Sequence, residues 1–287
     1  MAAIIRKELH EYFTSMTGYA SISFFLLVIG FFFTYFNLMY ADPDYAATIA
    51  SSIFALIFMA PFMTMRLFAA EKRQKTDILI FTSPVSIASI VVAKVISAIT
   101  VYLIGMAITI ILPLTLAPLG KLPVPLIISA YVGFALLGAC FMSLGAFVSS
   151  LTSNQIVATI SSCVLFVALF AIDAFLPLIP SNGAWSFAFI MALIAIIAAL
   201  TGYTTKNYIS PVIVILVAGG ANAALFFIKR DIFTGLIFKI LDACSITGRF
   251  SNFSAGVLSI ADIIFYISFS VAMIVITIAA IEKRRWR

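Results

Sequence analysis

Charged side chains are scarce in this sequence. They make up 10% of its 287 residues, whereas 64% are hydrophobic and the mean hydropathy is +1.21. A soluble domain has about 25% charged and roughly 45–50% apolar residues, because its surface needs polar groups. The shortage excludes an ordinary soluble fold, since an aqueous domain of this length could not bury so much apolar side chain. It indicates a protein whose solvent is lipid.

The residues and motifs of common enzymes are also missing. The single histidine, His10, excludes a His-Glu-x-x-His zinc site and disfavours a histidine-based triad. The sequence has no Gly-x-x-x-x-Gly-Lys-Ser/Thr loop for nucleotide hydrolysis and no Gly-x-Ser-x-Gly elbow. Its three cysteines have neither Cys-x-x-Cys nor metal-site spacing. We therefore expect a chain that is not an enzyme and carries no cofactor of its own.

What the sequence does have is long apolar runs. They are continuous and about twenty residues or longer, as in membrane-spanning helices, and lack the alternation of a membrane β-barrel. The predicted fold is all-α and polytopic, with eight spans. The spans are expected at 18–40, 46–67, 86–116, 124–150, 155–178, 184–203, 208–228 and 257–281. Pro113 and Pro118 should kink or end the third span. The stretch 184–228 is interpreted as two spans, with one re-entrant pair as the alternative.

The distribution of Lys and Arg predicts the orientation. With the N-terminus in the cytoplasm, 12 of these residues fall on the cytoplasmic side and 5 outside, as the positive-inside rule requires. An odd number of spans would place the basic C-terminal tail outside, so we expect an even number and two cytoplasmic termini. The net charge of +6 then reflects topology and needs no nucleic-acid partner. We expect a multi-pass plasma-membrane protein from a prokaryote.

Residues 1–17 are predicted to form a short amphipathic helix in the membrane interface. Arg6, Lys7 and His10 lie on its polar face. Its apolar face is formed by Ile5, Leu9, Tyr12, Phe13 and Met16. The alternative is an ordinary charged leader before a signal anchor.

Two acidic residues fall inside predicted spans. Asp173 lies near the outer end of the fifth span, and Asp262 lies early in the last. We interpret both as interfacial and reachable by water, because a carrier driven by ions would more often have ionisable groups at mid-depth. A secondary carrier is therefore ranked third, after the two functions that are considered below.

The connection between the second and third spans, residues 71–86, combines two kinds of surface. Its first half is charged and compatible with a helix, and its second half contains an apolar patch, Ile78 to Phe81, that is too short to span. Ser83 and Pro84 are suited to cap and begin the third span. An exposed apolar patch flanked by charge is typical of a docking surface for another protein. The alternative is a loop whose apolar residues rest on the membrane surface.

The residues of this connection carry a resemblance. The pattern from Glu71 through Thr76, Thr82, Ser83 and Pro84 to Ser86 resembles the coupling-helix motif of type-2 ABC exporter permeases. Residues 1–17 are similar to the elbow helix of that family. The stretch 249–257, followed by Asp262, Tyr266 and the Arg284-Arg285-Trp286 tail, is similar to its gliding-motility branch. Lys75 stands where many members have Gly, the acidic Asp77 comes one place early, and most relatives have six spans.

The resemblance implies a permease subunit that is driven by a separate ABC ATPase, which binds the ATP and Mg²⁺. A cavity lined by the abundant Phe, Leu, Ile and Met residues would suit a hydrophobic or amphipathic cargo. A second permease chain, identical or related, would complete the transporter. A coupling helix at 71–83 would dock on the ATPase through Glu71 as a charged contact or hinge, through an apolar plug at Ile78 to Phe81, and through rim contacts. The ATPase-coupling residues that it implies are Glu71, Arg73, Lys75, Thr76, Asp77, Ile78, Leu79, Ile80 and Phe81.

Two further interpretations concern other parts of the chain. Small residues follow one another along the fourth span at Ala139, Ser143, Ala146 and Ser150, and they would let a neighbouring helix approach closely. The segment 229–256 is expected to lie outside the cell, where it either gates an exit or rests on the membrane. The runner-up function is a membrane component that recruits an ATPase for assembly or signalling and transports nothing.

Overall fold

We describe a computed structural model of the chain. It describes residues 1–76, 85–118, 120, 122–175, 183–205, 215–220, 222 and 245–285. These residues are helical with short connections, and they contain no strand. They divide into two compact units, one formed by Met1–Leu169 with Ile246–Arg287 and the other by Phe170–Ser245. The prediction of an all-α protein is confirmed for the described part of the chain.

Six of the described helices are long and apolar enough to cross a membrane. They cover Met16–Leu38, Ile53–Gln74, Ile87–Thr115, Val124–Leu151, Gln155–Asp173 and Ile260–Lys283. By length and composition the chain is thus a multi-pass helical membrane protein. The remaining two predicted spans lie in the second unit. A helix is present at the first of them, α10 (Gly183–Thr205), and much of the span predicted at 208–228 lies outside the described residues.

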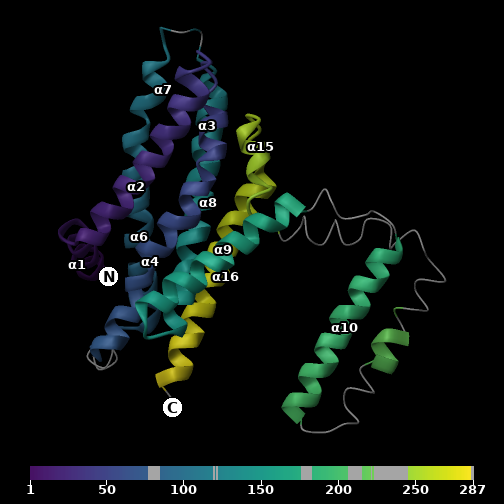
Figure 1. Ribbon diagram of the computed structural model, residues 1–287. Helices are drawn as coiled ribbons and strands as arrows, with labels where there is room; N and C mark the ends of the chain where they lie inside the picture. Colours follow the sequence, from purple (N-terminus) through teal and green to yellow (C-terminus); the bar gives the residue numbers. More distant parts are fainter. Residues whose placement is uncertain are drawn as a thin grey trace. The chain divides into compact units, whose positions relative to one another are not determined.

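In the described part of the first unit (Figure 1), eleven elements follow one another along the chain. They are α1 (Ala2–Thr14), α2 (Met16–Phe33), η1 (Thr34–Leu38), α3 (Ala46–Ser51), α4 (Ile53–Gln74), α6 (Ile87–Thr109), α7 (Ile111–Thr115), α8 (Val124–Leu151), α9 (Gln155–Phe175), α15 (Phe250–Ser254) and α16 (Ile260–Arg285), although the last residues of α9 belong to the second unit. The second unit contains α10, which packs against the π-helical turn η3 (Ile215–Gly219).

The boundaries of the second and third predicted spans differ from expectation. The span predicted at 46–67 is divided into α3 and α4, and α4 continues to Gln74. The extension has a simple cause, because Ala, Glu, Lys, Arg and Gln are all strong helix formers. The helix ends where Lys75 adopts a left-handed conformation with φ of 56°. The third span breaks at Ile110, in accordance with the prediction for Pro113, which cannot donate a backbone hydrogen bond to Thr109.

Both termini lie at one end of the first unit, together with the last turn of α4 and the start of α6 (Figure 1). The connection between η1 and α3 lies at the opposite end. There the buried Asn37 side chain donates to the carbonyls of Asp42 (2.8 Å) and Asp44 (2.9 Å) and accepts from the Thr48 hydroxyl. Two termini at one end agree with an even number of crossings, and the assignment of that end to the cytoplasm stays a prediction.

Helix α8 forms the centre of the first unit, because it packs against both α4 and α16. Buried aromatic residues of two other helices pack against its Phe134. The Phe25 ring of α2 stacks on Phe134 at 6.1 Å, and the hydroxyl of Tyr102, on α6, donates to the Phe134 carbonyl at 2.8 Å. Gly138 leaves the space that the Tyr102 ring occupies. Each buried aromatic removes roughly 150–250 Å² of surface from solvent and dominates the packing.

The seam between α4 and α8 depends on small residues. A Cβ atom at Gly145 would overlap the side chain of Thr64. One turn further, the Ser149 hydroxyl accepts the backbone N–H groups of Phe68 and Ala69 at 3.3 Å each and donates to the Met65 carbonyl at 3.1 Å. The predicted small-residue stripe lies nearby. Ser143, Ala146 and Ser150 are buried and Ala139 is half-buried. The sequence analysis did not single out Gly145, where an added Cβ atom would meet Oγ1 of Thr64.

Replacing Gly145 with alanine should destabilise the protein by about 1–3 kcal/mol, the usual range for an overpacked site. The added methyl group has no free space, because the side chain and helix of Thr64 are in direct contact with it. Thermal unfolding in detergent measures the effect. Gly30→Ala is the matched control, since no atom lies within 4 Å of its added Cβ and alanine has the higher helix propensity. Equal melting temperatures for the two variants would contradict this account of the seam.

Candidate functional site

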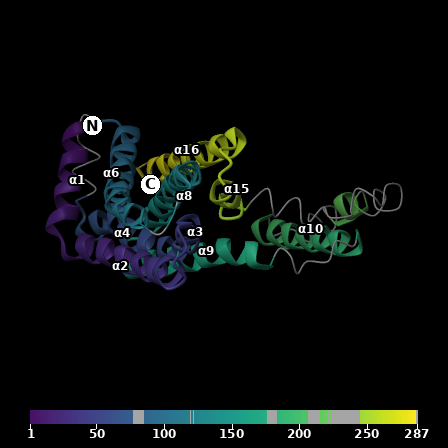
Figure 2. The same ribbon diagram turned by 90° about the horizontal axis from the view of Figure 1, so that it is seen from above.

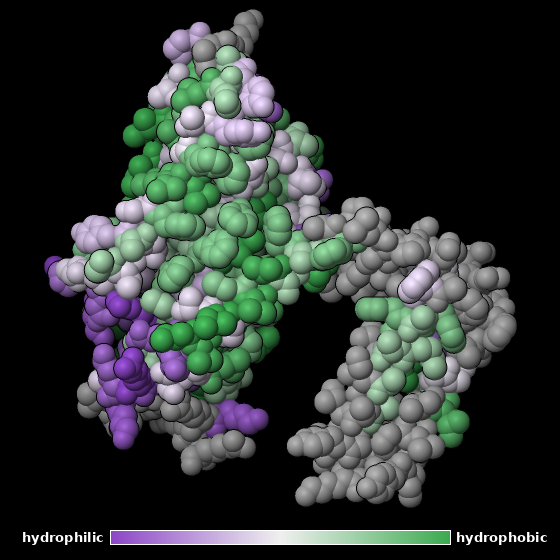
Figure 3. All heavy atoms as spheres, in the orientation of Figure 1, coloured by the Kyte–Doolittle hydropathy of each residue, from purple (hydrophilic) through white to green (hydrophobic). Residues whose placement is uncertain are grey.

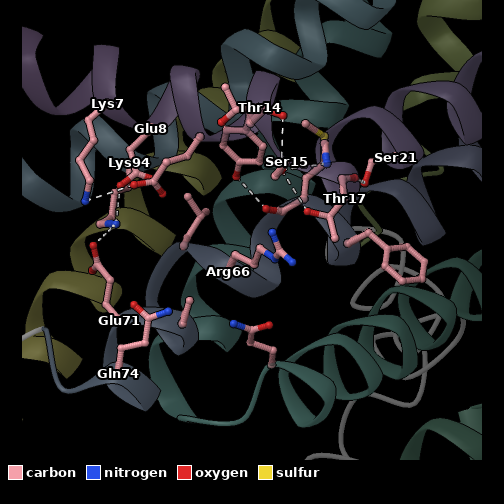
Figure 4. A pocket seen from close by; sticks show the side chains of 18 of the residues that line it. Lys7, Glu8, Thr14, Ser15, Thr17, Ser21, Arg66, Glu71, Gln74 and Lys94 are labelled. Atoms are coloured by element: carbon pink, nitrogen blue, oxygen red, sulfur yellow. Dashed lines mark hydrogen bonds and ion pairs between the residues drawn. The ribbon is translucent and has the colours of Figure 1, made fainter.

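Glu8, Glu71 and Lys94 form a buried charge cluster (Figure 4). The Lys94 ammonium lies 2.7 Å from Oε1 of Glu8 and 2.8 Å from Oε1 of Glu71. The side chain of Lys94 is 3% exposed, and those of the two glutamates are 7% and 17% exposed. Charges removed from water in this way are costly unless they are paired and hydrogen-bonded, as they are here.

Each member of the charge cluster comes from a different helix. Glu8 is on α1, Glu71 is in the last turn of α4, and Lys94 is about two turns into α6. The Lys94 ammonium also lies 5.6 Å from the centre of the Phe68 ring, within cation–π distance. One ammonium therefore joins α1 to the two helices that flank residues 77–84. The sequence analysis singled out neither Lys94 nor Glu8.

Helix α1 lies across the long helices of its unit, as the two views in Figures 1 and 2 show, and packs against α6 and α2. The predicted apolar face is present, with Leu9, Tyr12 and Phe13 packed against the core. The Tyr12 hydroxyl donates to the Met63 carbonyl at 2.7 Å, and burial raises the pKa of this tyrosine well above its usual range. Met16 was wrongly placed on that face.

The reason for the error at Met16 is a helix boundary. Ser15 is extended and caps α2, because its hydroxyl accepts the backbone N–H of Gly18 at 3.2 Å. Met16 is therefore the first residue of α2, and it is 88% exposed. The amphipathic helix ends at Thr14, before this break.

The described part of the predicted coupling segment is an extension of α4. Arg73 and Lys75 are exposed, while the hydroxyl of Thr76 donates to the Glu71 carbonyl at 3.4 Å. Glu71 is engaged by Lys94, and its assigned contact with an ATPase stays a prediction. The other coupling residues, Asp77, Ile78, Leu79, Ile80 and Phe81, lie outside the described residues.

The last turn of α4 is also tied to α8. The ammonium of Lys72 donates to the backbone carbonyl of Ser150, near the end of α8, where helix carbonyls have no partner within the helix. Together with the Ser149 hydrogen bonds, this contact fixes the end of α4 to the central helix. The end of α4 therefore connects mechanically to both α6 and α8.

A cavity of about 710 Å³ adjoins the charge cluster. It lies between α1, the start of α2 and the second half of α4, and the charge cluster lies at one side of it (Figure 4). Its other polar lining includes Arg66, Gln74, Gln155 and Thr17, and its apolar lining includes Phe62. Pockets of roughly 300–1,000 Å³ accommodate small-molecule ligands.

A second charge cluster is formed by Asp262, Arg249 and Asn252. The Asp262 carboxylate accepts from Nη1 of Arg249 at 3.0 Å and from Nδ2 of Asn252 at 2.8 Å. The Arg249 guanidinium lies 4.0 Å from the centre of the Phe265 ring. The side chain of Asp262 is only 6% exposed, so the interpretation of this residue as water-reachable is wrong. Its two partners replace the water that a buried carboxylate would otherwise need. Asp173 is half-buried.

Among the described residues, no group of three or more His, Cys, Asp and Glu side chains is arranged to hold a metal ion. Comparison with known proteins adds no relative. No protein-family model matches the chain, and neither a curated protein nor a solved structure is similar to it. The resemblance carried by residues 71–86 and 249–266 is therefore a hypothesis that depends on the sequence alone.

Proposed function

We propose that the chain is the permease subunit of a type-2 ABC exporter, driven by a separate ATPase that binds ATP and Mg²⁺. The observation that carries the proposal is the charge cluster of Glu8, Glu71 and Lys94. It joins the N-terminal helix to α4 and α6, the two helices between which the predicted coupling segment lies. A displacement of that segment would be transmitted to all three helices.

The transmission route follows from the contacts of α4. Its last turn is held to α6 by Glu71 and to α8 by Lys72. Helix α8 in turn packs along α16, where the thiol of Cys140 donates to the Tyr266 carbonyl at 3.1 Å. Packed interiors transmit displacement, because they have little free volume to absorb it. Closure of an ATPase on the coupling segment would thus move the core of the unit.

The residue roles in this proposal follow the sequence prediction. Arg73 and Lys75 are exposed at the C-terminal end of α4, where they are suited to contact the rim of the ATPase cleft. The apolar residues Ile78 to Phe81 would fill a cleft on the ATPase. The complete transporter would contain two permease chains, identical or related, in a prokaryotic plasma membrane with both termini in the cytoplasm. Its cargo would be hydrophobic or amphipathic.

Co-purification from the native membrane tests the proposal. The full chain, tagged at its C-terminus and extracted in mild detergent, should retain an ATPase with a Gly-x-x-x-x-Gly-Lys-Ser/Thr loop, in about equal amount to the chain. Mass spectrometry identifies it, and ATP hydrolysis by the purified complex confirms that it is active. A preparation that retains the second permease chain but no ATPase would overturn the proposal. An active complex that moves no cargo in vesicles would favour the recruitment function.

A further inference from the structure

The cavity beside the charge cluster contains an arginine that has no counterion among the described residues. Arg66 is exposed on α4 and lines the cavity. Within the described part of the chain, no carboxylate forms an ion pair with it. In Figure 4 its guanidinium lies between the Glu71–Lys94 side of the cavity and the side that carries Ser15 and Thr17. A guanidinium directed at a cavity is suited to bind a phosphate, because two of its N–H groups match two phosphate oxygens.

Further hydrogen-bond donors line the same cavity. The side-chain amides of Gln74 and Gln155 line the same cavity, and the structure gives neither a hydrogen-bond partner among the described residues. The Thr17 hydroxyl shares a hydrogen bond of 3.2 Å with Ser15 and also lines the cavity. These groups add neutral donors to the charged lining of the cavity.

The charges of the described residues that line the cavity cancel. Three cations line it, Lys7, Arg66 and Lys94, and so do three carboxylates, Glu8, Glu11 and Glu71. The charges are separated, however, because Lys94 is shared by two glutamates and leaves that side with an excess of one negative charge. A ligand that carried only a negative charge would meet this excess. A zwitterion with a phosphate and a protonated amine would match both sides.

The position of the cavity identifies the source of such a ligand. It lies at the end of the first unit where both termini are found, and Figure 3 shows hydrophilic residues gathered there below an apolar surface. Phe62, which is 45% exposed, lies at its lining one turn before Arg66. A headgroup at Arg66 would therefore have apolar surface beside it for the start of an acyl chain.

We propose that this cavity binds the headgroup of phosphatidylethanolamine, with the phosphate at Arg66 and the ammonium at the carboxylates of Glu71 and Glu8. An ethanolamine ammonium has N–H groups that can donate to these oxygens. A choline group has no N–H donor and is typically held in a cage of aromatic rings. The described lining of this cavity contains two aromatic residues, Tyr12 and Phe62. The proposal is independent of ABC transport, since lipid binding requires no ATPase.

Native mass spectrometry of the full chain in detergent tests this assignment. The protein is titrated separately with dioleoyl phosphatidylethanolamine, phosphatidylcholine and phosphatidylglycerol, and the bound fraction gives each affinity. We expect phosphatidylethanolamine to bind most tightly. Arg66→Gln should weaken its binding about tenfold, the factor that corresponds to the loss of one charge-assisted contact. Arg66→Lys should retain part of the affinity.

The matched control is Arg73→Gln, an exposed arginine on the same helix that does not line the cavity. It should bind lipid like the unaltered protein. Equal melting temperatures of the two variants would show that both are folded. The assignment is overturned if Arg66→Gln binds phosphatidylethanolamine as tightly as the unaltered chain does. It is also overturned if phosphatidylglycerol binds the unaltered chain at least as tightly as phosphatidylethanolamine.

Discussion

Replacing Lys94 with methionine is expected to destabilise the folded protein by about 3–5 kcal/mol, the usual cost of removing one partner from a buried ion pair. Methionine nearly preserves the length and the apolar stem of lysine, so packing should change little. The loss arises because Glu8 and Glu71 are then left buried without the ammonium that lies 2.7 and 2.8 Å from them. Thermal and chemical unfolding in detergent measure this loss.

Two further variants separate charge from packing. Lys7→Met removes a lysine of α1 that lines the same cavity. Its ion pair with Glu11 is 3.4 Å long and about 60% exposed on both sides, so we expect a change of about 0.5 kcal/mol or less. Adding Glu8→Gln and Glu71→Gln to Lys94→Met should restore much of the lost stability, because no unpaired charge then remains. If the triple variant is no more stable than Lys94→Met, the charge cluster is not what holds these helices together.

The second large effect is expected at Phe81, at the end of the predicted apolar plug. Phe81→Asp places a charge in the proposed ATPase interface, and the loss of a central aromatic contact typically costs about 2–4 kcal/mol, which corresponds to roughly 30-fold to 1,000-fold weaker binding. The measurement is the affinity of the purified permease for its ATPase. The prediction depends on the sequence pattern alone, since this residue lies outside the described part of the chain.

Tyr40→Asp is the matched control for Phe81→Asp. Tyr40 is aromatic like Phe81, but it lies outside the predicted plug. It is 66% exposed and follows η1, at the end of the unit opposite the termini. Its substitution should leave ATPase binding unchanged. Equal loss of binding in both variants would mean that aspartate disturbs the fold in general, and the plug assignment would then be wrong.

The spans were predictable because each depends on a local property, the length of an apolar run. The residues at which the helices begin and end were harder to predict. The sequence analysis ended the second span at residue 67, before the charged run that starts at Glu71, yet α4 continues to Gln74. A span ends where the helix leaves hydrocarbon, whereas a helix ends where its backbone changes direction, here at Lys75. Helix propensity of residues 69–74 was the available signal.

The charge cluster could not be predicted, because its members are distant in sequence. Glu8 and Lys94 are 86 residues apart, and Glu71 and Lys94 are 23 apart. Hydropathy treats each as one polar residue near the end of a span, and only the packing of α1 against α6 brings them together. The cavity depends on the same packing, and for that reason it has no signature in the sequence.

Asp262 is an intermediate case. An acidic residue in a span needs a partner, and Arg249 was available in the preceding segment, only 13 residues away. The sequence analysis named both residues as part of one resembling stretch but did not pair them. The general rule that buried charges are paired would have identified Arg249 as the candidate. It would not have identified Asn252 as the second donor, because either face of a short helix could have been turned toward the carboxylate.

ATP hydrolysis in reconstituted vesicles tests the central claim most directly. The partner ATPase is measured alone, with the unaltered permease, and with Phe81→Asp. If the chain is the membrane half of an ATP-driven exporter, the unaltered permease should raise the rate several-fold and Phe81→Asp should return it to the rate of the ATPase alone. A rate that is the same with and without the unaltered permease, or equal stimulation by both permeases, would contradict the account.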